Sequence, residues 1–174
     1  MSVMQYFSYA MKATAAALCL GSILLPSAHA QEVLSTHGDW TAYAYVENGK
    51  KVCYIASRPS KHEGSFKKRG EPYAIVTRRE PGKDREEISV TAGYPYKESG
   101  KVEVSISNIS FTLFTENEWA WAQNEAGDKE IVGAMVRGTT MTVKAESKVG
   151  TNSIDTYSLN GFSTARKAIA EACA

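Results

Sequence analysis

The stretch WTAYAYVENGKKVCYIAS, residues 40–57, decides the fold. Its first half alternates two sets of side chains, with Trp40, Ala42, Ala44 and Val46 on one face and Thr41, Tyr43 and Tyr45 on the other. Successive side chains of a strand point to opposite faces, so this alternation predicts a β-strand. Asn48-Gly49 supplies the positive φ angles of a tight turn. A return strand, with Cys53 and Ile55 on one face, completes the predicted hairpin.

Short candidate strands continue along the chain between turn signals such as Ser99-Gly100 and Gly127-Asp128. They cover residues 73–77, 88–91, 102–106, 110–114, 118–122, 131–137, 141–146 and 153–159. This pattern predicts an all-β, mostly antiparallel fold, either a β-sandwich or a flattened barrel of about eight to ten short strands. The segment 59–72 shows no period and is expected to form a long, mobile surface loop.

The spacing of apolar residues becomes helical after Leu159. Phe162, Ala165, Ile169 and Ala172 recur on one side, and Ser163 is a candidate N-cap. We therefore expect one C-terminal α-helix packed on the sheet.

The N-terminus has the pattern of a secretory signal peptide. Lys12 precedes an apolar run over residues 13–25, and Ala28-His29-Ala30 forms a cleavage site. We expect cleavage after Ala30, which leaves residues 31–174 as a single domain in the periplasm, secreted or associated with the outer membrane. The alternative is an uncleaved membrane anchor, although the apolar run is short of the roughly 20 residues that a span needs.

Two cysteines remain after this cleavage, because Cys19 lies in the signal. In an oxidising compartment, Cys53 and Cys173 are expected to form a disulfide between an early strand and the C-terminal helix. The alternative is two free thiols. Bonded cysteines cannot act as nucleophiles, because attack needs a free thiolate.

Neither the net charge nor any sequence motif indicates a catalytic or cofactor-dependent activity. The signal holds one of the 20 basic residues and none of the 19 acidic ones, so the mature chain is formally neutral. This balance argues against nucleic acid as a partner. Only His37 and His62 remain as histidines, and no hydrolase, zinc-protease or phosphate-loop motif occurs. We therefore expect no catalytic, cofactor-binding or metal-binding residues.

Aromatic residues are the candidates for binding. Trp119 and Trp121 are two apart and share a strand face, and Tyr94 and Tyr96 flank Pro95. Trp119, Tyr94 and Tyr96 are taken as a candidate surface for a protein or glycan partner in the envelope or on a host cell. The alternative is that these rings belong to the core.

Several short motifs together resemble the invasion-associated locus B family. They are Gly38-Asp39-Trp40, Gly70-Glu71-Pro72-Tyr73, Gly93-Tyr94-Pro95-Tyr96, Phe111-Thr112-Leu113-Phe114, Gly138-Thr139-Thr140-Met141, and Asp155-Thr156-Tyr157-Ser158-Leu159 followed by Gly161-Phe162 and Cys173. The resemblance spans nearly the whole mature chain and implies a proteobacterial exported protein without known catalytic residues or cofactor. Some members carry a further cysteine after the opening Gly-x-Trp, where this chain has Tyr43, Ala44 and Tyr45.

Three functional hypotheses follow. The leading one is an exported, non-enzymatic envelope or surface protein that acts by binding, in host-cell invasion or envelope homeostasis. The second is a structural or chaperone-like periplasmic module that offers a strand edge or an aromatic face. The third is an enzyme of undescribed mechanism, which would require ionisable groups converging in a pocket.

Overall fold

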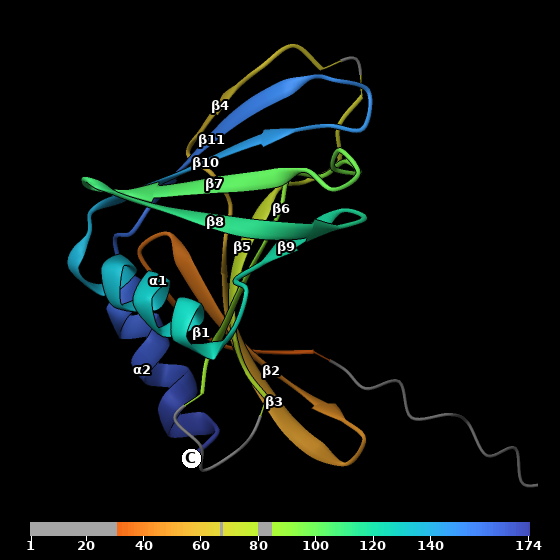
Figure 1. Ribbon diagram of the computed structural model, residues 1–174. Coiled ribbons are helices and arrows are strands. Elements are labelled where there is room, and N and C mark those ends of the chain that lie inside the picture. Colours follow the sequence, from red (N-terminus) through yellow and green to blue (C-terminus); the bar gives the residue numbers. More distant parts are fainter. Residues whose placement is uncertain (1–30, 67, 80–84) are drawn as a thin grey trace, which may run out of the picture.

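The computed structural model describes residues 31–66, 68–79 and 85–174, and its elements are labelled in Figure 1. In chain order these are β1 Glu32–His37, β2 Trp40–Glu47, β3 Lys50–Ser57, β4 Lys61–Glu63, β5 Tyr73–Arg78, β6 Glu87–Thr91, β7 Lys101–Ile106, β8 Ile109–Glu116, β9 Trp119–Trp121, α1 Glu125–Arg137, β10 Thr140–Glu146, β11 Asn152–Ser158 and α2 Phe162–Ala172. The expected signal peptide, residues 1–30, lies outside the described residues. Among the described residues, no helix is long and apolar enough to cross a membrane.

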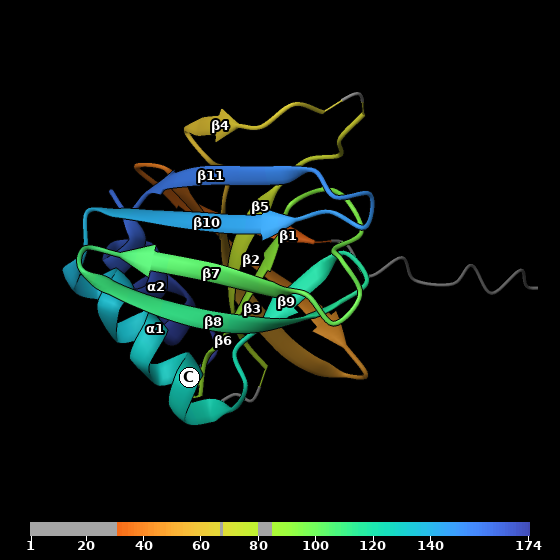
Figure 2. The same ribbon diagram turned by 45° about the horizontal axis from the view of Figure 1, so that its top comes forward.

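The described strands form one antiparallel sheet in the order β1-β2-β3-β5-β6-β9-β8-β7-β10-β11-β4. The sheet bends sharply, so that β8, β7, β10 and β11 run crosswise to β2, β3, β5 and β6 (Figures 1 and 2). A single apolar core draws on both parts of the sheet and on both helices. The predicted mostly antiparallel β fold with a C-terminal helix is confirmed. The sheet is open, with β1 and β4 as its edges.

Strand β2 shows how alternation builds the core. Trp40, Ala42 and Ala44 face inward and are almost fully buried. The two alanines are small enough for α2 to approach β2 closely, and Phe162 from α2 meets the ring of Trp40 edge-on at 5.0 Å between centroids. The indole nitrogen of Trp40 donates a hydrogen bond to the carbonyl of Ser158 at 2.9 Å, so the buried ring has its polar partner.

The predicted disulfide also links α2 to the sheet. Cys53 on β3 and Cys173 just after α2 are both buried and bonded, with their Cα atoms 6.1 Å apart. The bridge joins the inward face of β3 to the end of the last helix. It therefore holds α2 over the sheet at the end of the helix opposite to Phe162.

The loop before α2 depends on a glycine rather than on the expected Ser163 cap. Gly161 occupies the N-cap position with φ of 86°, and no side chain caps the helix. A Cβ atom at this position would lie 1.9 Å from the carbonyl oxygen of His37. Glycine is required because the loop passes against the β1–β2 turn in a left-handed conformation.

Helix α1 replaces the strand expected over residues 131–137. Asn124 caps it by accepting a hydrogen bond from the Gly127 amide at 3.0 Å, so Gly127-Asp128 lies in the first helical turn. Asp128, Ile131 and Met135 are buried at helical spacing. The carboxylate of Asp128 accepts a hydrogen bond from the Ile88 amide at 2.9 Å, which fastens α1 to β6.

Two further expectations are corrected at the sheet edges. The expected loop 59–72 contains the three-residue strand β4, which pairs with β11, and part of the segment is anchored through Arg69. Strand β1, which the alternation pattern did not reveal, pairs with β2 and carries an irregularity between Val33 and Ser35.

Candidate binding site

The outer face of the sheet, opposite the helices, carries a row of aromatic rings. The outward residues of β2 and β3 include Tyr43, Tyr45 and Tyr54, whereas Trp119 and Trp121 come from β9. These rings are half-buried rather than enclosed, because none of the described helices covers this face. The alternation of side chains that turns Trp40 and Ala42 toward the core therefore turns Tyr43 and Tyr45 outward.

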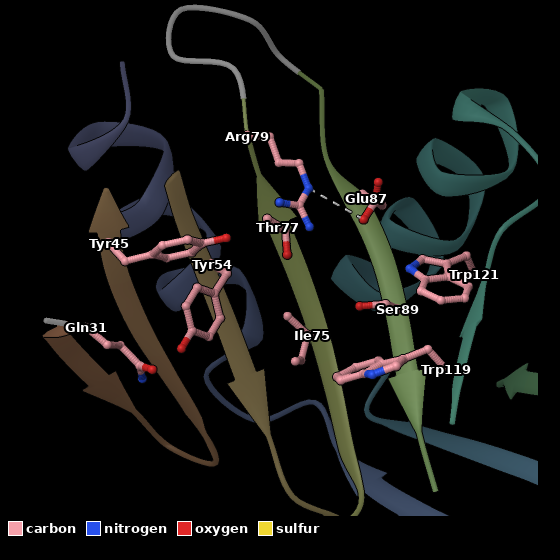
Figure 3. A pocket seen from close by; sticks show the side chains of 10 residues that line it. All are labelled: Gln31, Tyr45, Tyr54, Ile75, Thr77, Arg79, Glu87, Ser89, Trp119 and Trp121. Carbon is pink, nitrogen blue, oxygen red and sulfur yellow. Dashed lines mark ion pairs between the residues drawn. The ribbon is translucent and has the colours of Figure 1, made fainter. Parts of the chain in front are cut away.

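A groove of about 530 Å³ lies between these rings. We call it the aromatic groove, and its lining residues are drawn in Figure 3: Gln31, Tyr45, Tyr54, Ile75, Thr77, Arg79, Glu87, Ser89, Trp119 and Trp121. Tyr45 and Tyr54 stand on one side and the two tryptophans on the other, across the strands β5 and β6 (Figure 3). The groove therefore has two aromatic walls.

The floor between the walls is made of short side chains. Ile75 and Ser89 pair across β5 and β6, and Thr77 lies two residues further along β5. Ser89 also pairs with Trp121 on β9, so the hydroxyl lies directly beside one wall. The aliphatic side chain of Ile75 flanked by two hydroxyls offers both van der Waals contact and hydrogen bonding to a ligand.

Ring contacts hold the walls in place. Tyr54 stacks on Tyr43 at 4.9 Å and meets Tyr45 edge-on at 6.0 Å. On the opposite wall, Trp121 stacks on Phe114 of β8 at 5.7 Å. Such pairs fix the orientation of rings that are only partly buried.

The charges of the groove balance. Arg79 lies 3.9 Å from the carboxylate of Glu87 and 3.2 Å from that of Glu47 at the rim. Burial raises the pKa of Tyr54 to about 12, with Tyr43 and Tyr45 adding to the rise, so its hydroxyl remains protonated at neutral pH. The groove thus presents uncharged rings and hydroxyls with one paired cation.

The family model described as "Invasion associated locus B (IalB) protein" matches residues 40–170. The chain belongs to the IalB family. The match runs from the first residue of β2 into α2 and includes both walls of the aromatic groove. The resemblance drawn from the short motifs is confirmed.

A solved structure shows the same fold. It is the crystal structure of invasion associated protein b from Bartonella henselae, which is 18% identical, covers 81% of this chain and 97% of its own, and has a TM-score of 0.60. At this identity the likeness shows the fold alone. No curated protein matches this IalB family chain.

The structure separates the residues of the expected binding surface. Trp119 lines the aromatic groove together with Trp121. Tyr94 and Tyr96 are buried, with 7% and 5% of their surfaces exposed, so they do not form an exposed patch with Trp119. The expectation of one continuous surface from these three residues is wrong.

Long-range contacts explain why Tyr94 is buried. Its ring stacks on Phe66 at 5.6 Å and lies under the guanidinium of Arg69 at 5.5 Å, and its hydroxyl bonds to that of Ser153 at 2.5 Å. Tyr96 packs edge-on against Tyr94 at 5.7 Å, and burial raises its pKa above the ordinary tyrosine value. Both rings therefore belong to the core of this IalB family member.

The most deeply buried carboxylate among the described residues is held by an arginine and a histidine. Asp155 is 1% exposed and is bound by both terminal nitrogens of Arg69 and, at 3.0 Å, by Nδ1 of His62. Arg69 also donates to the carbonyl of Ala92 at 2.6 Å. These contacts fasten the segment after β4 to the sheet, so His62 has a structural partner rather than lying free in solvent.

A second buried carboxylate, Glu86, is paired in the same way. It contacts Arg78 at 3.2 Å and Arg166 of α2 at 2.7 Å. Within the described ranges, no cluster of three or more metal-ligating side chains occurs. The ionisable groups that converge are engaged in salt bridges that join elements of the fold.

Sequence reasoning missed most of the aromatic groove. The alternation in the sequence predicts that Tyr45 lies on the face opposite Trp40, but nothing local indicates that this face is the open one. The available signal was the shared outward phase of β2, β3 and β9, each carrying aromatic residues with polar neighbours. That signal is readable only when the strand order is known.

Proposed function

We propose that this IalB family protein is an exported, non-enzymatic envelope or surface protein that acts by binding through the aromatic groove. The observation that carries the proposal is the pair of half-exposed aromatic walls around a floor of short side chains. Aromatic residues of this kind dominate binding energies, because large rings make wide contacts at little entropic cost. The partner lies in the envelope or on a host cell, with host-cell invasion or envelope homeostasis as the biological setting.

Export is part of the same proposal. We infer that residues 1–30 are a signal peptide cleaved after Ala30, which would export the protein to the periplasm or to the cell surface in peripheral association with the outer membrane. The bonded Cys53 and Cys173 support an oxidising compartment. Intact mass spectrometry of the native protein without reduction is expected to give an N-terminus at Gln31 and two fewer hydrogens than the dithiol. A retained signal or two free thiols would overturn this part.

The binding test uses two variants on opposite sides of the molecule. Trp119→Ala combined with Trp121→Ala removes one wall of the groove, whereas Val136→Ala alters an exposed apolar residue of α1. Immobilised native protein and both variants are incubated with purified outer-membrane and host-membrane fractions, and retained material is quantified. We expect the double variant to lose retention and Val136→Ala to keep it. Equal retention by all three proteins would exclude the groove as the binding site.

The edges of the sheet give less support to a chaperone-like module. Strand addition needs a long, flat, unpaired edge. Edge strand β4 has only three residues, all exposed, and two of them form a salt bridge, Lys61 with Glu63. Edge strand β1 is irregular between Val33 and Ser35, which interrupts its ladder. The groove is therefore the stronger candidate for partner binding.

A further inference from the structure

We propose that the ligand of the aromatic groove is an extended, uncharged glycan chain. This inference rests on the proposed binding function and names the chemical class of the ligand. A sugar ring has an apolar C–H face that stacks on an aromatic ring and an edge of hydroxyl groups that both donate and accept hydrogen bonds. The groove has to supply both kinds of contact.

The two walls supply the stacking surfaces. Tyr54 and Tyr45 lie on one side of β5 and β6 and the tryptophans on the other, so successive sugar rings of one chain can stack on the two walls (Figure 3). Within the described part of the chain, the indole nitrogens of Trp119 and Trp121 and the hydroxyls of the two tyrosines make no hydrogen bond. This contrasts with buried Trp40, whose indole nitrogen is bonded to Ser158. The wall rings therefore offer polar atoms as well as faces.

The floor supplies acceptors beside these donors. The hydroxyls of Ser89 and Thr77 both donate and accept, and the carboxylate of Glu87 accepts. A proline-rich peptide also stacks on aromatic rings, but its backbone offers carbonyl acceptors and needs mainly donors. The mixture of donors and acceptors matches the hydroxyl edge of a sugar better than the edge of such a peptide.

The balance of charged side chains in the aromatic groove favours an uncharged ligand. Among the described residues, Arg79 is the only cationic side chain that lines the groove, and it is paired with Glu87 at 3.9 Å and Glu47 at 3.2 Å. An anionic polymer would meet these carboxylates, and a cationic one would have to displace Arg79. A neutral chain avoids both costs.

The length of the aromatic row favours an extended chain over a single sugar. From β2 to β9 the outer face crosses four strand spacings, about 19 Å. A second hollow of about 420 Å³ lies on the same face and includes Tyr43 and Tyr73. The stack of Tyr43 on Tyr54 joins the two hollows, and Arg58 lies 5.2 Å over the ring of Tyr73 at the far end.

Calorimetric titration of the mature chain tests the inference with three neutral hexasaccharides. Hexa-N-acetylchitohexaose and cellohexaose are straight β-1,4-linked ribbons, whereas maltohexaose is curved. We expect the straight chains to bind at least about tenfold more tightly than maltohexaose, and Trp119→Ala with Trp121→Ala to weaken them by about tenfold or more. Val136→Ala should bind like the native chain. Affinity should not change between low and high salt, because the ligand is uncharged.

Several results would overturn the inference. They are no binding of either straight hexasaccharide, equal binding by the groove variant, or a steep fall with salt. Binding of a proline decapeptide at the tryptophans in place of the hexasaccharides would overturn the glycan assignment but leave the groove as a binding site. A native dimer that Trp119→Ala converts to monomer would show a second copy in the groove, which overturns the inference. Loss of retention on membrane fractions by the groove variant remains the separate test of the proposed function.

Discussion

The two faces of β2 carry similar residue types and do different things. Trp40 faces inward, is fully buried, and has its indole nitrogen bonded to Ser158. Tyr45, five residues later, faces outward into a groove beside Tyr54. The difference lies in what covers each face, because α2 closes the inner one and no described helix closes the outer one. Aromatic residues become core or exposed surface according to the element that packs above them.

The largest loss in the free energy of unfolding is expected when an aromatic residue of the inner face is removed. Trp40→Ala deletes the ring that meets Phe162 and leaves the Ser158 carbonyl without its donor. We expect a loss of about 4 kcal/mol in the free energy of unfolding, measured by urea denaturation. Trp40→Phe keeps a ring and should lose less. If Trp40→Ala cost no more than Trp119→Ala, the distinction between the faces would fail.

Removing the disulfide tests how much the attachment of α2 to the inner face of the sheet stabilises the fold. Replacing Cys53 and Cys173 together by alanine removes the link between β3 and the end of α2 without adding a polar group. We expect the free energy of unfolding to fall by about 3 kcal/mol, because the unfolded chain is no longer restricted. Reduction of the native protein serves as the control and should give a similar loss. An unchanged urea midpoint would show that the bridge does not stabilise the fold.

Much of the inner face was predictable from local pattern. The alternation in β2, the helical spacing of Phe162, Ala165 and Ile169, and the pairing of the two cysteines all hold in the structure. Each of these depends on periodicity or on a pair of rare residues. A repeating pattern survives in the sequence because every member faces the same environment.

The predictions from the sequence are wrong where long-range contacts determine the structure of a segment. Tyr94 lies in a Gly-Tyr-Pro-Tyr segment that reads as a turn, but its burial depends on Ser153, 59 residues away. Helix α1 resembled a strand because Ile131 and Val132 are β-branched and Gly127 suggested a turn. Its true signal was Asn124 as an N-cap, together with buried residues at helical spacing. The outer groove escaped notice because it joins strands that are distant in sequence.

Alkaline pH is expected to lower the free energy of unfolding gradually. Burial raises the pKa of Tyr157 well above its ordinary value, and likewise raises that of Tyr96. In the unfolded chain these tyrosines ionise near pH 10, so above that pH the unfolded state holds fewer protons than the folded state. The free energy of unfolding should therefore be unaffected by these groups below about pH 10 and fall as the pH rises beyond it. Urea denaturation between pH 8 and about pH 11 measures this, and a rise in stability over that range would contradict the assignment.

The smallest effects on stability are expected in the groove, where they also distinguish its two tryptophans. Trp121 stacks on Phe114 at 5.7 Å, whereas Trp119 makes no ring contact with the described residues. Trp121→Ala should therefore cost about 1 kcal/mol in the free energy of unfolding and Trp119→Ala about half of that. Both are half-exposed, so neither change leaves a large cavity. If Trp119→Ala destabilised the fold as much as Trp40→Ala, the ring would be part of the core, and the outer face would lose its claim to be a binding surface.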